Sequence, residues 1–143
     1  MRDEVDYNHS PVRHDIAMQC VDEHDRPLIF MATFSYDPAA PYAVSITCHL
    51  VEADLWWTTE RSLIEAGLTR RVGFGMVRVE PARCEAGWPM VAISLLSAAG
   101  CLETKAELGA IQRFLAETRR LVPAGTESTH VDLDELVAEL LEP

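Results

Sequence analysis

The chain has 143 residues, which is enough for one ordinary domain and too few for two. Apolar residues make up 48% and charged residues 24%, a globular composition that excludes a disordered or fibrous chain. Twelve Lys and Arg against 23 Asp and Glu give a net charge of −11, which disfavours nucleic acid and anionic membranes as partners. We therefore expect one domain over residues 1–143, with residues 1–11 as a flexible tail.

No segment has the pattern of a secretion signal or a membrane anchor. The chain begins with polar and acidic residues, and its longest nearly uncharged stretch, Trp88 to Leu102, is shorter than the roughly 20 residues that a membrane span needs. The four cysteines form no Cys-x-x-Cys pair. We expect reduced thiols in a cytosolic protein, with a metal or redox framework as the less favoured alternative.

Two-residue alternation of apolar side chains dominates the first third of the chain and predicts antiparallel strands joined in a meander. The predicted strands are Val12–Cys20, Leu28–Tyr36, Tyr42–Leu50 and a short Leu55–Thr58. A helix follows, which Thr58 or Thr59 can cap. Gly67 suits the left-handed position just beyond its end.

The second half predicts further strands. In Arg71–Val79 the apolar side chains alternate, but they move to the other face of the strand near its end. We therefore expect a bulge at Gly73 and Gly75. Trp88–Leu96 is apolar on both faces, which is typical of an interior strand. A tight turn at Ser97–Gly100 then leads into a short strand from Cys101 to Glu103.

Two capping boxes predict the remaining helices. Thr104 and Glu107 begin one helix, which Pro123 ends, and Asp132 and Glu135 begin the last. From Glu127 onwards there are six acids and no Lys or Arg, so the last helix has an anionic outer face. The whole order indicates an α+β fold, with antiparallel sheet curled into a barrel-like core, helices after the strand groups and a C-terminal helix.

The common catalytic and metal-binding motifs are absent from the sequence. The histidines do not pair at metal-ligand spacing, and we expect His14 and His49 to be structural or solvated. We therefore predict no enzyme, no catalytic or metal site and no cofactor. An active site of scattered residues is the remaining enzymatic alternative, and it would need a deep pocket lined by ionisable side chains.

Two features allow either a structural or a binding role. Trp56 and Trp57 project to opposite faces of one strand, so either both fill core layers or one anchors a partner. Five arginines gather around the fifth strand and form either a solvated face, which we favour, or a binding patch. They are Arg61, Arg70, Arg71, Arg78 and Arg83.

Four motifs resemble those of the SsgA-like proteins, actinobacterial regulators of sporulation-specific cell division. They occur in family order, at matching spacing, over about Val12 to Leu140. Tyr36–Val44 is similar to the family's YDxxxPYAV, and Trp57 with Arg61–Leu68 is similar to W…RDLLxxGL. Gly73–Pro81 is similar to GxGDVRVWP, and Leu121–Glu127 with Asp132–Asp134 is similar to VPxGTE…DLD.

The resemblance implies a whirly-like fold, a trimer of antiparallel sheets braced by helices, and no enzymatic activity. It also implies control of where and when the division GTPase FtsZ assembles at septa. The resemblance extends to the septal, SsgB-type member of the family, and it implies recruitment of FtsZ, with the membrane reached only through a membrane-associated partner. Relatives with the same fold bind single-stranded nucleic acid, which gives the competing function.

Single-strand binders need a positive groove with stacking aromatics, so the net charge favours a protein-interaction module over the nucleic-acid alternative. We expect a cytoplasmic homotrimer at the division septum, which binds FtsZ and other septal proteins through surface contacts. The candidate partner-binding residues are Tyr36, Asp37, Tyr42, Trp56, Arg61, Arg78, Glu135 and Glu139.

Overall fold

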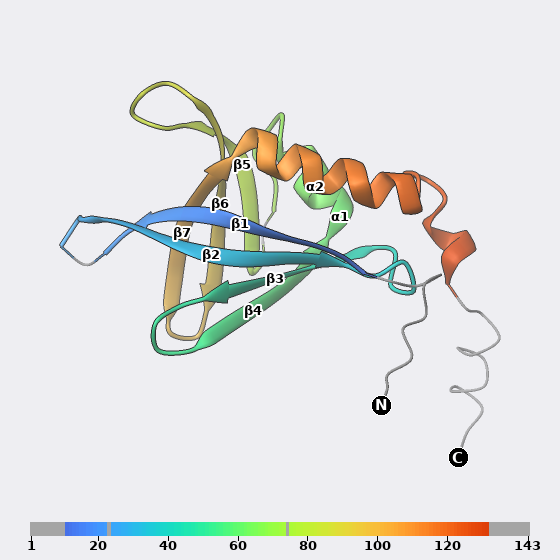
Figure 1. The fold of residues 1–143 in the computed structure, drawn as a ribbon, viewed down its shortest axis with the longest axis horizontal. Helices are drawn as coiled ribbons and strands as arrows, with labels where there is room; N and C mark the ends of the chain where they lie inside the picture. The colour runs from blue at the N-terminus through green and yellow to red at the C-terminus, as the bar shows by residue number, and fades with distance from the viewer. Residues whose placement is uncertain (1–10, 23, 74, 132–143) are drawn as a thin grey trace, which may run out of the picture.

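The computed structural model describes residues 11–22, 24–73 and 75–131. In these residues, seven antiparallel strands form one sheet in the order β4-β3-β2-β1-β7-β6-β5, and two α-helices pack on it (Figure 1). The elements are β1 (Val12–Val21), β2 (Pro27–Tyr36), β3 (Ala43–His49), β4 (Asp54–Glu60), α1 (Arg61–Gly67), β5 (Val77–Arg83), β6 (Pro89–Ser97), β7 (Gly100–Glu107), α2 (Leu108–Leu121) and a short 3₁₀ helix, η2 (Glu127–His130).

The predicted alternation is confirmed in β1 to β3, where most of the side chains on one face of each strand enter the core, apart from the exposed Leu28. Phe34 and Tyr36 of β2 and Ile46 of β3 are buried, whereas their neighbours in sequence face outwards. Helix α2 packs against β1, β6 and β7, and its Phe114 meets Phe34 in a T-shaped contact at 5.7 Å between ring centroids. The core therefore lies between the inner face of the sheet and α2.

The sheet is curled into a half-barrel, as expected. Trp57 on β4 donates its indole N–H to the Leu96 carbonyl on β6 at 2.8 Å, although four strands separate β4 from β6 in the sheet order. Figure 1 shows the strands wrapping beneath α2. The curl brings the two ends of the sheet towards each other.

The capping box predicted at Thr104 is wrong. Strand β7 continues to Glu107, and α2 begins only at Leu108. Thr104 is buried, and its hydroxyl donates to the Ile93 carbonyl at 2.7 Å. Pairing with β6 supplies β7 with partners over its whole length, and this outweighs the local preference for a helix start. The predicted end of the helix is confirmed, because α2 stops just before Pro123.

The predicted cap and end of α1 are also wrong. Thr58 and Thr59 lie within β4, and Glu60 precedes the first helical residue. Gly67 is the last helical residue and has no left-handed backbone. A Cβ at Gly67 would lie 2.2 Å from Val79 Cγ1, so a glycine is required here by the close approach of α1 to β5.

The segment predicted as one strand with a bulge turns back on itself instead. Val72 forms an isolated antiparallel bridge with Val79, with N···O distances of 2.9 and 3.0 Å in the two directions. Gly73 has a φ of +104°, which favours glycine in the turn between them. Strand β5 therefore begins at Val77, where the alternation changes face. The last helix from Asp132, and the tail apart from residue 11, lie outside the described residues.

Candidate functional site

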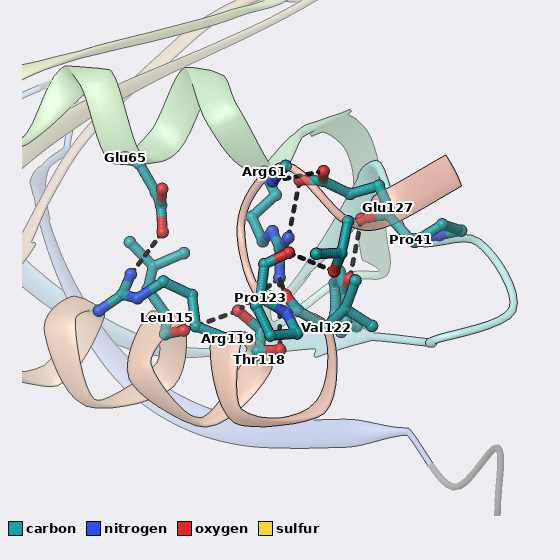
Figure 2. A network of polar contacts seen from close by, with 12 residues as sticks. Pro41, Arg61, Glu65, Leu115, Thr118, Arg119, Val122, Pro123 and Glu127 are labelled. Atoms are coloured by element: carbon teal, nitrogen blue, oxygen red, sulfur yellow. Dashed lines mark hydrogen bonds and ion pairs between the residues drawn. The ribbon is translucent and has the colours of Figure 1, made fainter. Parts of the chain in front are cut away.

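Arg61 is buried although it is the first residue of α1, and it is only 2% exposed. Its guanidinium reaches the C-terminal end of α2 (Figure 2). There Nη1 donates to the Val122 carbonyl at 2.7 Å and to the Thr118 carbonyl at 3.3 Å, while Nη2 donates to Glu127 Oε2 at 2.8 Å. We call this arrangement the arginine clamp, since it ties α1 to α2 and η2.

The clamp also fixes the end of β2 and the loop that follows. The Tyr36 ring lies 5.0 Å from the guanidinium carbon, a cation–π distance, and its hydroxyl donates to the Pro41 carbonyl at 2.8 Å. The Arg61 backbone N–H donates to the Tyr42 carbonyl at 2.8 Å. Three of the four motifs that carry the family resemblance therefore meet at one buried position.

Glu127 balances the buried charge of Arg61. The hydrogen bond from Arg61 holds the pKa of Glu127 below its ordinary value, and the Gly125 amide donates to its other oxygen at 2.9 Å. The glutamate side chain is 15% exposed, so the pair lies at the edge of the interior. Since these polar groups satisfy one another, the clamp is a structural device.

Two of the predicted partner-binding residues are buried in the clamp. Tyr36 and Arg61 lie in the interior of this chain, not on its surface, because each packs into the clamp. The motif spacing could not reveal this, since Arg61 finds its acceptors 57 to 66 positions away in sequence. The only sequence signal was an arginine and a glutamate in two separate motifs.

The remaining candidates do not form one cluster. Asp37 is exposed, and its carboxylate accepts the Ala39 amide at 2.9 Å, which shapes the turn after β2. Tyr42 is 53% exposed in the same loop. Trp56 on β4 and the half-buried Arg78 on β5 lie on the two outermost strands. Glu135 and Glu139 lie outside the described residues.

The exposed face of β1 to β4 combines apolar and polar side chains, and we call it the outer sheet face. Ile29 is 70% exposed, Met31 44% and Trp56 71%. Trp57 points the other way into the core, so the two tryptophans have different environments. This face presents large apolar side chains that the described part of the chain does not cover.

A chain of polar contacts crosses the outer sheet face. The Thr33 hydroxyl donates to Asp15 at 2.8 Å, and its oxygen lies 2.8 Å from His49 Nε2. The other ring nitrogen of His49 lies 3.1 Å from Asp54. His14 contacts Glu117 and meets the Phe114 ring at 5.5 Å, so both histidines have structural partners, as predicted.

Two of the exposed arginines, Arg71 and Arg83, interact with neighbouring groups of the chain itself. Arg71 lies 3.9 Å from Glu80, and Arg83 donates to the Gly87 carbonyl at 2.9 Å. These contacts favour the solvated face over the binding patch. Among the described residues there is no group of three or more His, Cys, Asp or Glu that could hold a metal ion.

Burial makes Cys48 a poor nucleophile. Cys48 is buried, and burial raises its pKa to about 11, so its thiol is protonated at neutral pH. Cys101 is exposed on β7, not at a helix start, because β7 continues beyond it. In the described part of the chain, no helix is long and apolar enough to cross a membrane.

Comparison with known proteins decides the family. Residues 30–127 match the family described as "Streptomyces sporulation and cell division protein, SsgA". The chain belongs to the SsgA family. The match confirms the resemblance drawn from the four motifs, and the family's description names a division protein and no enzyme class.

Relatives from several actinobacteria place the chain with the SsgB-type members of the SsgA family. It is 37% identical to the sporulation-specific cell division protein SsgB of Streptomyces coelicolor over 128 residues, 89% of this chain and 93% of that protein. It is 34% identical to SsgB of Frankia casuarinae, with 93% of each chain covered.

Solved structures of the SsgA family share this fold. An SsgB structure, reported with mutations that correlate with longitudinal cell division in Streptomyces coelicolor, superposes with a TM-score of 0.79 at 36% identity, over 85% of this chain and 96% of that one. The SsgA-like sporulation-specific cell division protein of Thermobifida fusca gives 0.81 at 30% identity, over 94% and 98%. The α+β fold with curled antiparallel sheet is thereby confirmed.

Proposed function

We propose that this chain regulates sporulation-specific cell division by binding other proteins, and that it recruits the division GTPase FtsZ to the septum or promotes its assembly there. The observation that carries the proposal is the outer sheet face, where Ile29, Met31 and Trp56 expose apolar surface in a chain of the SsgA family. Exposed aromatic and aliphatic side chains of this kind are typical of protein interfaces.

We further propose that the working form is a cytoplasmic homotrimer. A heterologous contact that repeats around a three-fold axis closes into a ring of three chains. Light scattering after gel filtration tests this directly, since a trimer has three times the chain mass of 15.9 kDa. A mass that stays at one chain over a range of concentrations would contradict the trimer.

Co-sedimentation tests the partner. Purified chain is mixed with FtsZ and GTP, and the polymers are pelleted. We expect the chain to appear in the pellet in proportion to polymer, and the polymers to lengthen. The same mixture with GDP, which gives no polymers, is the control. Unchanged pelleting and unchanged polymer length with and without the chain would refute the proposal.

The competing function is binding of single-stranded nucleic acid, since Trp56 is an exposed aromatic that could stack on a base. Asp54 and Glu60 on the same strand, however, place negative charge where phosphates would pass. We therefore expect no change in fluorescence anisotropy of a labelled single strand at low salt. Tight binding that weakens steeply with salt would favour the nucleic-acid function over the protein-binding function.

A further inference from the structure

The two edges of the sheet are built differently. On β5, Val79 already pairs with Val72, and Pro81 offers no N–H to another strand. On β4, no strand of the described residues pairs beyond β3, although the Trp57 indole reaches Leu96 of β6 on the inner side, and the central Leu55 to Thr59 contain neither proline nor charge. Natural proteins usually protect their sheet edges with charges, proline or a covering segment. The protection of one edge and not the other indicates that β4 is left open for a partner.

We propose that β4 is a docking edge, to which an extended segment of a partner protein adds as a further strand of the sheet. This inference rests on the proposed function as a protein-binding module. In strand addition, main-chain hydrogen bonds supply affinity, and alternate side chains supply specificity. Trp56, 71% exposed on the outer face, and Leu55, 42% exposed on the inner side, are the side chains that an added strand would contact.

Charge identifies the chemistry of the partner segment. Asp54 and Glu60 stand at the two ends of β4. If the β4 strands of two copies paired in antiparallel register, Asp54 would face Glu60 at both ends, and a parallel pair would set each acid against itself. Like charges directly opposite each other are destabilising. The partner segment therefore carries basic residues at both ends of a short apolar or β-branched stretch.

The terminal segments of the chain itself have the wrong charge for this edge. Residues 1–10 contain three acids and a single arginine, and residues 132–143 contain five acids and no Lys or Arg. Either segment would add negative charge beside Asp54 and Glu60. The occupant is accordingly a segment of another protein.

A synthetic peptide tests the docking edge without FtsZ. The probe is a short fluorescein-labelled peptide of alternating valine and threonine, flanked by paired lysines. We expect saturable binding at physiological salt, with new hydrogen-exchange protection of the β4 amides, because added-strand pairing engages the main chain. The same peptide with glutamates in place of the lysines should bind at least about tenfold more weakly. A peptide methylated on alternate backbone nitrogens should not bind, since it cannot complete the ladder.

Two exposed tryptophans provide a matched pair of variants. Trp56→Lys removes the contact residue and places a charge on the edge, so we expect a loss of affinity of about tenfold or more. Trp88→Lys changes a tryptophan that is 69% exposed outside β4, and it should leave the affinity unchanged. Circular dichroism of both variants checks that the fold is retained.

Each outcome decides the inference. Failure of the lysine-flanked peptide to bind, or equal binding by the Trp56→Lys and Trp88→Lys variants, would overturn it. A wild-type chain that self-associates through β4, and that Trp56→Lys converts to a monomer, would overturn it in favour of a second copy. If the peptide binds as expected but FtsZ does not co-sediment, the docking edge stands and the FtsZ proposal fails. If FtsZ co-sediments but the peptide does not bind, the proposed function stands and the inference of a docking edge at β4 fails.

Discussion

A charged side chain in a protein interior is costly unless the interior replaces its water with partners. Arg61 has such replacements: two carbonyls at the end of α2, the Glu127 carboxylate and the face of Tyr36. All of these partners come from distant parts of the sequence. A charged residue after a strand normally predicts exposure, so the burial of Arg61 could not be predicted from its own neighbourhood.

Replacing Arg61 tests the clamp. Arg61→Met keeps an unbranched apolar stem but removes the guanidinium, so the Val122 carbonyl and Glu127 Oε2 lose their donor. We expect the free energy of unfolding, measured with urea, to fall by about 3 kcal/mol. Arg120→Met, at an exposed position in the last turn of α2, should change it by less than about 0.5 kcal/mol. Equal stability of the two variants would contradict the clamp.

Acid titration tests the charge pairing at Glu127. Because Arg61 lowers the pKa of Glu127 in the folded chain, the carboxylate stabilises the fold above the ordinary glutamate pKa of about 4.3. That contribution is lost as the pH falls through the lowered value. The urea midpoint of the wild type should therefore fall more steeply below about pH 4.3 than that of Glu127→Gln. Parallel curves for the two proteins would exclude the pairing.

At the scale of elements, alternation predicted the strands well because burial of one sheet face imposes a period of two. It predicted β1, β2 and β3 to within a few residues, whereas β6 was predicted from a run that is apolar on both faces. The start of α2 was missed because Thr104 has the sequence of a cap but pairs with Ile93 in a strand. Local patterns cannot report a partner elsewhere in the chain, and the same limit hid the clamp.

Replacing each of two helical glycines by alanine should change the stability of the fold in opposite directions. In Gly67→Ala, the new Cβ would meet Val79 at 2.2 Å, so α1 must shift from β5. We expect a loss of about 1–3 kcal/mol in the free energy of unfolding. In Gly109→Ala, the new Cβ meets only the flexible end of Arg113 at 3.3 Å, so the better helix propensity of alanine should stabilise the fold by up to about 1 kcal/mol. Both are measured by urea unfolding, and a Gly67→Ala protein as stable as Gly109→Ala would refute the close packing of α1 on β5.

For the whole molecule, the mean charge is a poor guide to any one surface. Residues 1–10 and 132–143 together carry seven of the eleven net negative charges. The sheet and helices between them are closer to balance, with arginines on the exposed side of α2. We therefore expect partner choice to depend on local charges, which at the open edge of the sheet are those of Asp54 and Glu60.

Hydrogen exchange of the chain with and without assembled FtsZ measures most directly whether the molecule works by binding at its open edge. The account predicts slower exchange in peptides that cover residues 54–60, with the rest of the sheet and α2 little changed. It would be contradicted by exchange that FtsZ leaves unaltered throughout the chain, or by protection that is confined to the helices.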